Sequence, residues 1–63
     1  MNKEKIKLTL SVQEAAELLG VSVPTVYKLI HAESFPSFKV GSRTLISYSQ
    51  LVEWVEQQAG GEL

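Results

Sequence analysis

Residues 12–30, VQEAAELLGVSVPTVYKLI, constrain the fold more than any other stretch, because they predict two short helices joined by a glycine turn. In the first half, apolar residues recur at positions i, i+3, i+4 and i+7, which predicts a helix over 12–19. Ser11 and Glu14 form the S-x-x-E pattern of a capping box at its start. Gly20 stands where the chain must leave this helix, and a left-handed backbone costs glycine little.

The second helix is predicted over 23–32. Ser22 can cap it, and Pro24 falls in its first turn, where no backbone N–H is needed. A helical wheel gives this helix one apolar and one polar face. The apolar face holds Val23, Val26, Leu29 and Ile30, and the polar face holds Pro24, Thr25, Lys28 and His31, with Tyr27 on the boundary. A helix that docks by one face and leaves a polar face free suits the recognition of a DNA major groove.

The residues around the turn make this pattern more specific. Ala16 is small where a crossing helix would come close, and Val21 can pack into the angle between the helices. With Gly20 and Val26, these residues resemble the helix-turn-helix of DNA-binding proteins. The alternative is an αα-hairpin with no role in nucleic-acid binding.

Individual side chains of the polar face suit different contacts with DNA. Thr25 can contact a base edge or a thymine methyl, and Lys28 can reach guanine or a phosphate. Two roles stay open for Tyr27: its hydroxyl contacts a phosphate, or its ring is half-buried in the core. His31 has no cysteine or second histidine at ligand spacing, so we expect no metal site.

After the second helix the pattern changes to strands. Phe35–Pro36 must be extended or in a turn, because proline disfavours helix in the residue before it. Residues 38–46 alternate around Gly41–Ser42, which suits a two-residue type II′ hairpin. Such a turn pairs Val40 with Arg43 and Phe38 with Leu45. The pattern leaves open which face of the hairpin meets the core.

A last helix is predicted after Ser47, which forms a second capping-box pattern with Gln50. Trp54 is expected to anchor this helix on the core, and Ala59–Gly61 to end it. The expected fold is mainly α with a small β-hairpin wing: a winged helix-turn-helix with three helices and a short N-terminal strand at 8–10.

We expect one domain at residues 8–59, with a flexible arm at 1–7 and a flexible tail at 60–63. A chain of 63 residues supports only one small core. Lys3, Lys5 and Lys7 in the arm either touch phosphate or only keep the arm solvated.

The stretches LTLSVQEAAELLGVSVPTVYKLI, FPSFKVGSRTLI and SYSQLVEWV resemble the small excisionase-type, MerR-like DNA-binding domains. The resemblance covers residues 8–57, and its most specific parts are SVQEAAELLGVSVPTVYKLI and KVGSR at this spacing. It implies a recognition helix at 22–32 and a wing at 39–44, both bound to double-stranded DNA. The implied contact residues are Ser22, Pro24, Thr25, Tyr27, Lys28, Lys39, Ser42, Arg43 and Thr44. Some such proteins are excisionases that organise attachment-site DNA and recruit an integrase, and others are small transcriptional regulators.

The chain departs from this family in two places. The wing is often rich in arginine, but here Arg43 is the only arginine. Val23–Pro24 stand where a longer polar or basic residue is common. Both departures predict weaker phosphate binding, so that affinity for one site depends on cooperative self-association along DNA. They also leave open a protein-interaction module on the same fold, with an exposed apolar patch around Phe35 and Phe38.

The net charge of −1 and the pI near 5.7 argue against strong non-specific binding to DNA, since Lys and Arg supply most of that affinity. The distribution of charge offsets this argument. Lys28, Lys39 and Arg43 lie in the second helix and the hairpin, so one face of the domain can be positive. The alternative for Arg43 is a surface ion pair with Glu53 or Glu56.

Composition excludes several other classes of protein. The absence of cysteine excludes a disulfide framework and thiolate metal sites, and fits a reducing cytoplasm. No apolar run approaches the ~20 residues of a membrane span, and residues 1–10 lack the apolar core of a signal peptide. The sequence contains no glycine-rich phosphate loop and places no serine or carboxylate partner beside His31. We therefore expect no enzymatic activity and no cofactor, in a cytoplasmic, nucleoid-associated protein.

Overall fold

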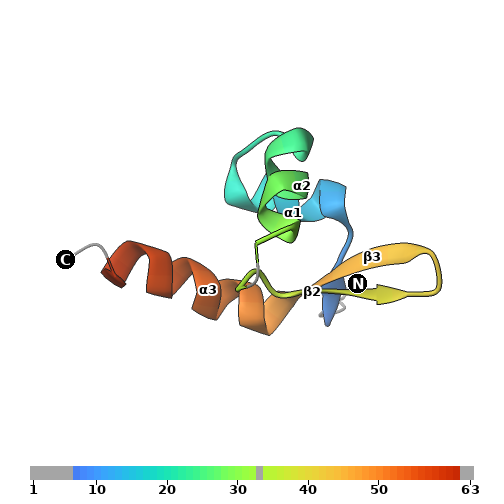
Figure 1. The fold of residues 1–63 in the computed structure, drawn as a ribbon. Coiled ribbons are helices and arrows are strands. Elements are labelled where there is room, and N and C mark those ends of the chain that lie inside the picture. The colour runs from blue at the N-terminus through green and yellow to red at the C-terminus, as the bar shows by residue number, and fades with distance from the viewer. Residues whose placement is uncertain (1–6, 33, 62–63) are drawn as a thin grey trace, which may run out of the picture.

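A computed structural model describes residues 7–32 and 34–61 of the chain. The elements follow the order β1 (Thr9–Leu10), α1 (Val12–Leu19), α2 (Val23–Ile30), β2 (Ser37–Val40), β3 (Arg43–Ser47) and α3 (Tyr48–Gly61). The strands form one antiparallel sheet in the order β1-β3-β2. Figure 1 shows α1 and α2 together above the sheet, with the β2–β3 hairpin at one end of the molecule and α3 at the other. The predicted winged helix-turn-helix fold is confirmed. Among the described residues, no helix has the length and apolar character needed to cross a membrane.

α1 begins at the predicted capping box. Ser11 Oγ accepts the backbone N–H of Glu14 at 3.1 Å, and the Glu14 carboxylate accepts the backbone N–H of Ser11 at 2.9 Å. The Lys7 ammonium donates to the same carboxylate. The hydrogen bond from Lys7, followed by the one from Ser11, holds the pKa of Glu14 below its ordinary value. The cap therefore stays charged at neutral pH.

α1 ends in a left-handed turn at Gly20, where φ is +75°. The backbone N–H groups of Gly20 and Val21 both donate to the Ala16 carbonyl oxygen, at 2.9 and 3.0 Å. These bonds satisfy a carbonyl that the end of the helix leaves open. Val21 is 39% exposed and lies outside the buried cluster, so its side chain is not what closes the turn. Backbone hydrogen bonds close the turn instead.

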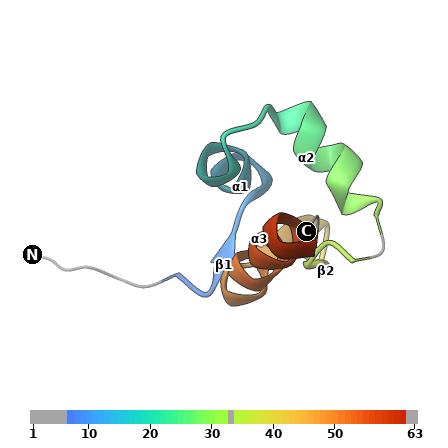
Figure 2. The same ribbon diagram turned by 90° about the vertical axis from the view of Figure 1, so that its left-hand side faces the viewer.

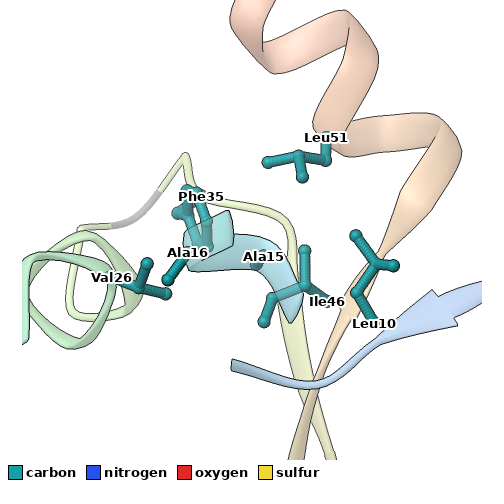
Figure 3. Close-up of a cluster of buried hydrophobic side chains, with 7 residues drawn as sticks. All are labelled: Leu10, Ala15, Ala16, Val26, Phe35, Ile46 and Leu51. Carbon is teal, nitrogen blue, oxygen red and sulfur yellow. The ribbon is translucent and has the colours of Figure 1, made fainter. Parts of the chain in front are cut away.

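One apolar cluster joins all the helices to the sheet (Figure 3). It consists of Leu10, Ala15, Ala16, Val26, Phe35, Ile46 and Leu51, all buried. Ala15 and Ala16 place only methyl groups on the buried side of α1. Ala16 lies on the side of Val26, which is completely buried, and Ala15 on the side of Ile46, so α1 can come close to both α2 and β3. Val23, Leu29 and Ile30 pack around this cluster, which confirms the predicted apolar face of α2. α2 ends at Ile30 rather than at residue 32, and His31 is its C-cap.

The hairpin has the register predicted from its turn. Phe38 pairs with Leu45, and Val40 with Arg43. Gly41 has a φ of +62° and Ser42 does not have a positive φ, as a type II′ turn requires. The sequence did not decide which face of the hairpin meets the core. In the structure this face carries Ile46, which pairs with Leu10 of β1 and is completely buried.

α3 follows β3 directly. Ser47 Oγ accepts the backbone N–H of Gln50 at 3.4 Å, which is one half of the predicted capping box. Trp54 packs edge-on against Phe35, with ring centroids 5.1 Å apart and planes at 85°, and anchors α3 on the core as expected. The helix continues through Gly61, although Ala59–Gly61 were predicted to end it. Glycine inside a helix costs only about 1 kcal/mol, which does not by itself stop one. Residues 62–63 lie outside the described part.

The close approach of α1 and α2 gives a first prediction. Ala16→Leu should destabilise the domain by about 1–3 kcal/mol, because Ala16 is only 3% exposed and a larger side chain would overpack the contact. Gln13→Leu is the matched control, since Gln13 is an exposed residue of the same helix. Thermal melts followed by circular dichroism measure both variants. If Ala16→Leu melts at the wild-type temperature, the proposed helix contact is refuted.

The turn gives a second prediction: alanine should lower the stability of the domain at Gly20 but not at Gly60. A Cβ at Gly20 or at Gly60 would meet no other atom within 4 Å, so only the backbone decides the effect. Gly20→Ala should cost about 1–2 kcal/mol, because alanine resists the left-handed conformation. Gly60→Ala, within α3, should leave stability unchanged or raise it by up to about 1 kcal/mol. Denaturant titrations test both, and equal effects would contradict this account of the turn.

Candidate nucleic-acid interface

The outward face of α2 is polar and accessible. Pro24, Lys28 and His31 are exposed, and Thr25 is half-buried at the start of the helix. Tyr27 is 50% exposed, and its hydroxyl makes no hydrogen bond to the described part of the protein. Tyr27 does not belong to the buried cluster or to the residues packed around it, so the half-buried core ring is not seen, and a contact of its hydroxyl with phosphate stays a prediction.

Ser22 orders the first turn of α2. Its Oγ accepts the backbone N–H of Thr25 at 3.3 Å and lies 2.9 Å from Thr25 Oγ1. When Ser22 donates its hydrogen to Thr25 Oγ1, the hydrogen of Thr25 remains available for another acceptor. The two coupled hydroxyls thus stand at the N-terminal end of α2, where the helix dipole favours negative charge.

The β2–β3 hairpin supplies the second group of predicted contact residues. Lys39, Ser42 and Arg43 are exposed, and Thr44 is half-buried. Arg43 directly follows the two-residue turn. Within residues 7–32 and 34–61, no carboxylate lies at ion-pair distance from Arg43, so the pairing with Glu53 or Glu56 does not occur in this structure.

The apolar patch expected around Phe35 and Phe38 is only half present. Phe35 is buried against Trp54, because the loop after α2 returns the chain to the core, whereas Phe38 is exposed on the hairpin. Val40 lies on the same face as Phe38 and is also exposed, opposite Arg43. Val40 was not predicted to be part of this apolar patch, although the alternation of side chains along the strand places it on the same face as Phe38.

Charge divides between the elements. Among the described residues, the acids lie on α1 and α3: Glu14, Glu17, Glu53 and Glu56. The bases of α2 and the hairpin are Lys28, Lys39 and Arg43. Lys7 is already paired with Glu14. Figure 2 shows α1 and α2 side by side, and Figure 1 shows the hairpin and α3 at opposite ends of the molecule. The small net charge therefore conceals a division between basic and acidic elements.

Comparison with protein families agrees with this geometry. A profile described as a helix-turn-helix domain matches residues 9–59. The chain belongs to this helix-turn-helix family. The match confirms the family resemblance seen over residues 8–57, and it covers all the helices and strands except the last two residues of α3. Comparisons with curated proteins and with solved structures gave no significant match.

Membership of the helix-turn-helix family gives each element a place in a known arrangement. α1, the Gly20 turn and α2 form the motif, and the β2–β3 hairpin is the wing. Helix-turn-helix domains bind DNA with the second helix of the motif in the major groove. The domain is accordingly a DNA-binding regulatory domain.

Proposed function

We propose that this domain is a sequence-specific DNA-binding protein, either an excisionase-like recombination directionality factor or a small transcriptional regulator. The observation that carries the proposal is the division of charge: α2 and the wing hold bases, and α1 and α3 hold acids. The DNA backbone is attracted to the first pair of elements and repelled by the second. Charge alone thus selects the side of the domain that faces DNA.

In this proposal α2 reads the major groove. Thr25, whose hydroxyl is coupled to Ser22, contacts a base edge or a thymine methyl. Lys28 reaches guanine or a phosphate, and Tyr27 gives its hydroxyl to a phosphate. Pro24 lies exposed in the first turn, close to the groove wall.

The wing contacts the flanking backbone or the minor groove. Arg43 suits either place, because its planar guanidinium binds phosphate through two hydrogen bonds and tolerates partial desolvation. Lys39 adds a second charge, and Ser42 and Thr44 add hydroxyl donors beside it.

Three bases give a weak electrostatic contribution. If Lys28, Lys39 and Arg43 each neutralise one phosphate, log K falls with log salt with a slope of about −2.7. A domain with so few phosphate contacts binds a single site weakly, and cooperative self-association along DNA would raise its affinity. An excisionase role also implies an integrase or recombinase partner, and a neighbouring integrase gene would favour it. Either role places the protein in the cytoplasm with the nucleoid and requires no catalysis.

Lys28→Ala tests the recognition helix. The substitution should weaken binding to a labelled duplex and lower the salt slope by ~0.9 if Lys28 contacts a phosphate. Lys7→Ala is the matched control, because it removes one positive charge that is paired with Glu14 outside α2 and the wing. Fluorescence anisotropy at several salt concentrations measures both slopes. Equal slopes in Lys28→Ala and the wild type, with equal affinities, would show that Lys28 does not contact DNA. If Thr25→Ala also leaves binding unchanged, α2 is not the element that reads DNA.

Arg43→Ala tests the wing. The substitution should weaken DNA binding by about 1–3 kcal/mol if a charge-assisted hydrogen bond is lost. The melting temperature should stay unchanged, since Arg43 is exposed beside a turn. Arg43→Lys keeps the charge but loses the planar fork, so we expect an intermediate affinity if the contact uses two hydrogen bonds. Unchanged affinity of Arg43→Ala at low salt would exclude the wing as a DNA contact and favour the protein-interaction alternative.

A further inference from the structure

A second surface lies between α1 and α3. The two helices line an open groove of about 280 Å³. Neither α2 nor the hairpin contributes a residue to it. Leu18 and Leu19 of α1 face Tyr48, Leu51, Val52 and Val55 of α3 across it, and Glu56 also lines it. We call this surface the α1–α3 groove.

The α1–α3 groove collects side chains that a monomer usually buries. Leu18 is 60% exposed, and Tyr48, Val52 and Val55 are exposed as well. On α3 the last three follow the spacing i, i+4, i+7 and form one continuous stripe. Of the nine large apolar side chains exposed in the described part of the chain, these four line the same groove, so they form a patch rather than a scatter.

The one charged side chain that lines the groove, Glu56, is acidic, and the other charged side chains of both helices are acidic as well. α1 and α3 together carry four glutamates and no lysine or arginine. Glu56 lines the groove itself, and Glu17 directly precedes Leu18. In the described part of the chain only Glu14 has an ion-pair partner. An occupant must therefore supply both apolar side chains and positive charge.

We propose that the α1–α3 groove binds a basic amphipathic helix of a partner protein. An apolar stripe at i, i+4 and i+7 on that helix matches the stripe of α3, and a flanking lysine or arginine complements the Glu56 carboxylate. A second copy of this domain would bring two acidic grooves together, and DNA would be repelled by the same charges. The proposal is independent of DNA binding, because it uses no residue of α2 or the wing.

The test is an NMR titration of the ¹⁵N-labelled 63-residue chain with a synthetic helical peptide. The peptide has about four helical turns, with leucines at i, i+4 and i+7 and lysines beside them. A matched peptide carries glutamate in place of each lysine. We expect the lysine peptide to shift the amide signals of Leu18, Val52 and Val55, and to bind at least about tenfold more tightly than the glutamate peptide.

Variants of the protein separate the apolar contribution from the electrostatic one. Leu18→Ser combined with Val52→Ser should weaken binding of the lysine peptide at least about tenfold, whereas Leu8→Ser should not, because Leu8 is 82% exposed and lies outside the groove. Glu56→Gln should weaken binding more than Glu53→Gln, since Glu53 does not line the groove. Glu56→Gln changes one exposed charge, so it remains informative if the double variant does not fold.

Three results would overturn the proposal. The first is no signal change up to about 1 mM peptide, or changes confined to other surfaces. The second is equal binding of the lysine and glutamate peptides. The third is concentration-dependent shifts of groove residues without peptide, which would assign the groove to a second copy. A DNA titration of the same variants tests the proposed DNA binding separately. We expect the DNA affinity of these variants to match that of the wild type.

Discussion

Val26 of α2 and Ala16 of α1 are buried in one cluster, and the position of the recognition helix depends on this packing (Figure 3). The small side chain of Ala16 leaves room for a close helix approach, and the left-handed Gly20 turns the chain back for it. Once Val26 is buried, helical geometry requires the opposite face of α2 to point outward. That face holds Lys28 and the other polar residues proposed to meet DNA.

The same core positions the other functional surfaces. Ile46 joins the hairpin to the buried cluster, and Phe35 with Trp54 joins α3 to it. Because a domain of this size buries only about 60% of its unfolded surface, the recognition helix, the wing and the α1–α3 groove share one small source of stability. Core substitutions should therefore affect all three surfaces together, whereas surface substitutions should separate them.

Local patterns predicted most of the fold. The bounds of α1, the turn at Gly20 and the hairpin register follow from caps, periodicity and turn chemistry, each set by neighbours in sequence. Predictions that depended on distant contacts were less accurate. Phe35 is buried because Trp54, far along the chain, covers it, and the inner face of the hairpin is fixed by pairing of Ile46 with Leu10.

The functional surfaces show the same difference between features set by local sequence and features set by distant contacts. The polar residues of α2 could be assigned from a helical wheel, because the apolar side of a single helix determines them. The α1–α3 groove could not be found this way, since it exists only where Leu18 and the stripe of α3 come together. The stripe itself, Tyr48, Val52 and Val55, was visible in the sequence as a helical spacing.

The central claim is that α2 and the wing form one DNA-binding face, fixed by the charge division. The most direct measurement is an NMR titration of the ¹⁵N-labelled 63-residue chain with a random-sequence duplex at low salt, where phosphate contacts dominate. The account predicts shifts of amide signals in residues 22–31 and 39–44, with α3 beyond Trp54 unaffected. Shifts concentrated on α1 and α3, or no shifts at low salt, would contradict it.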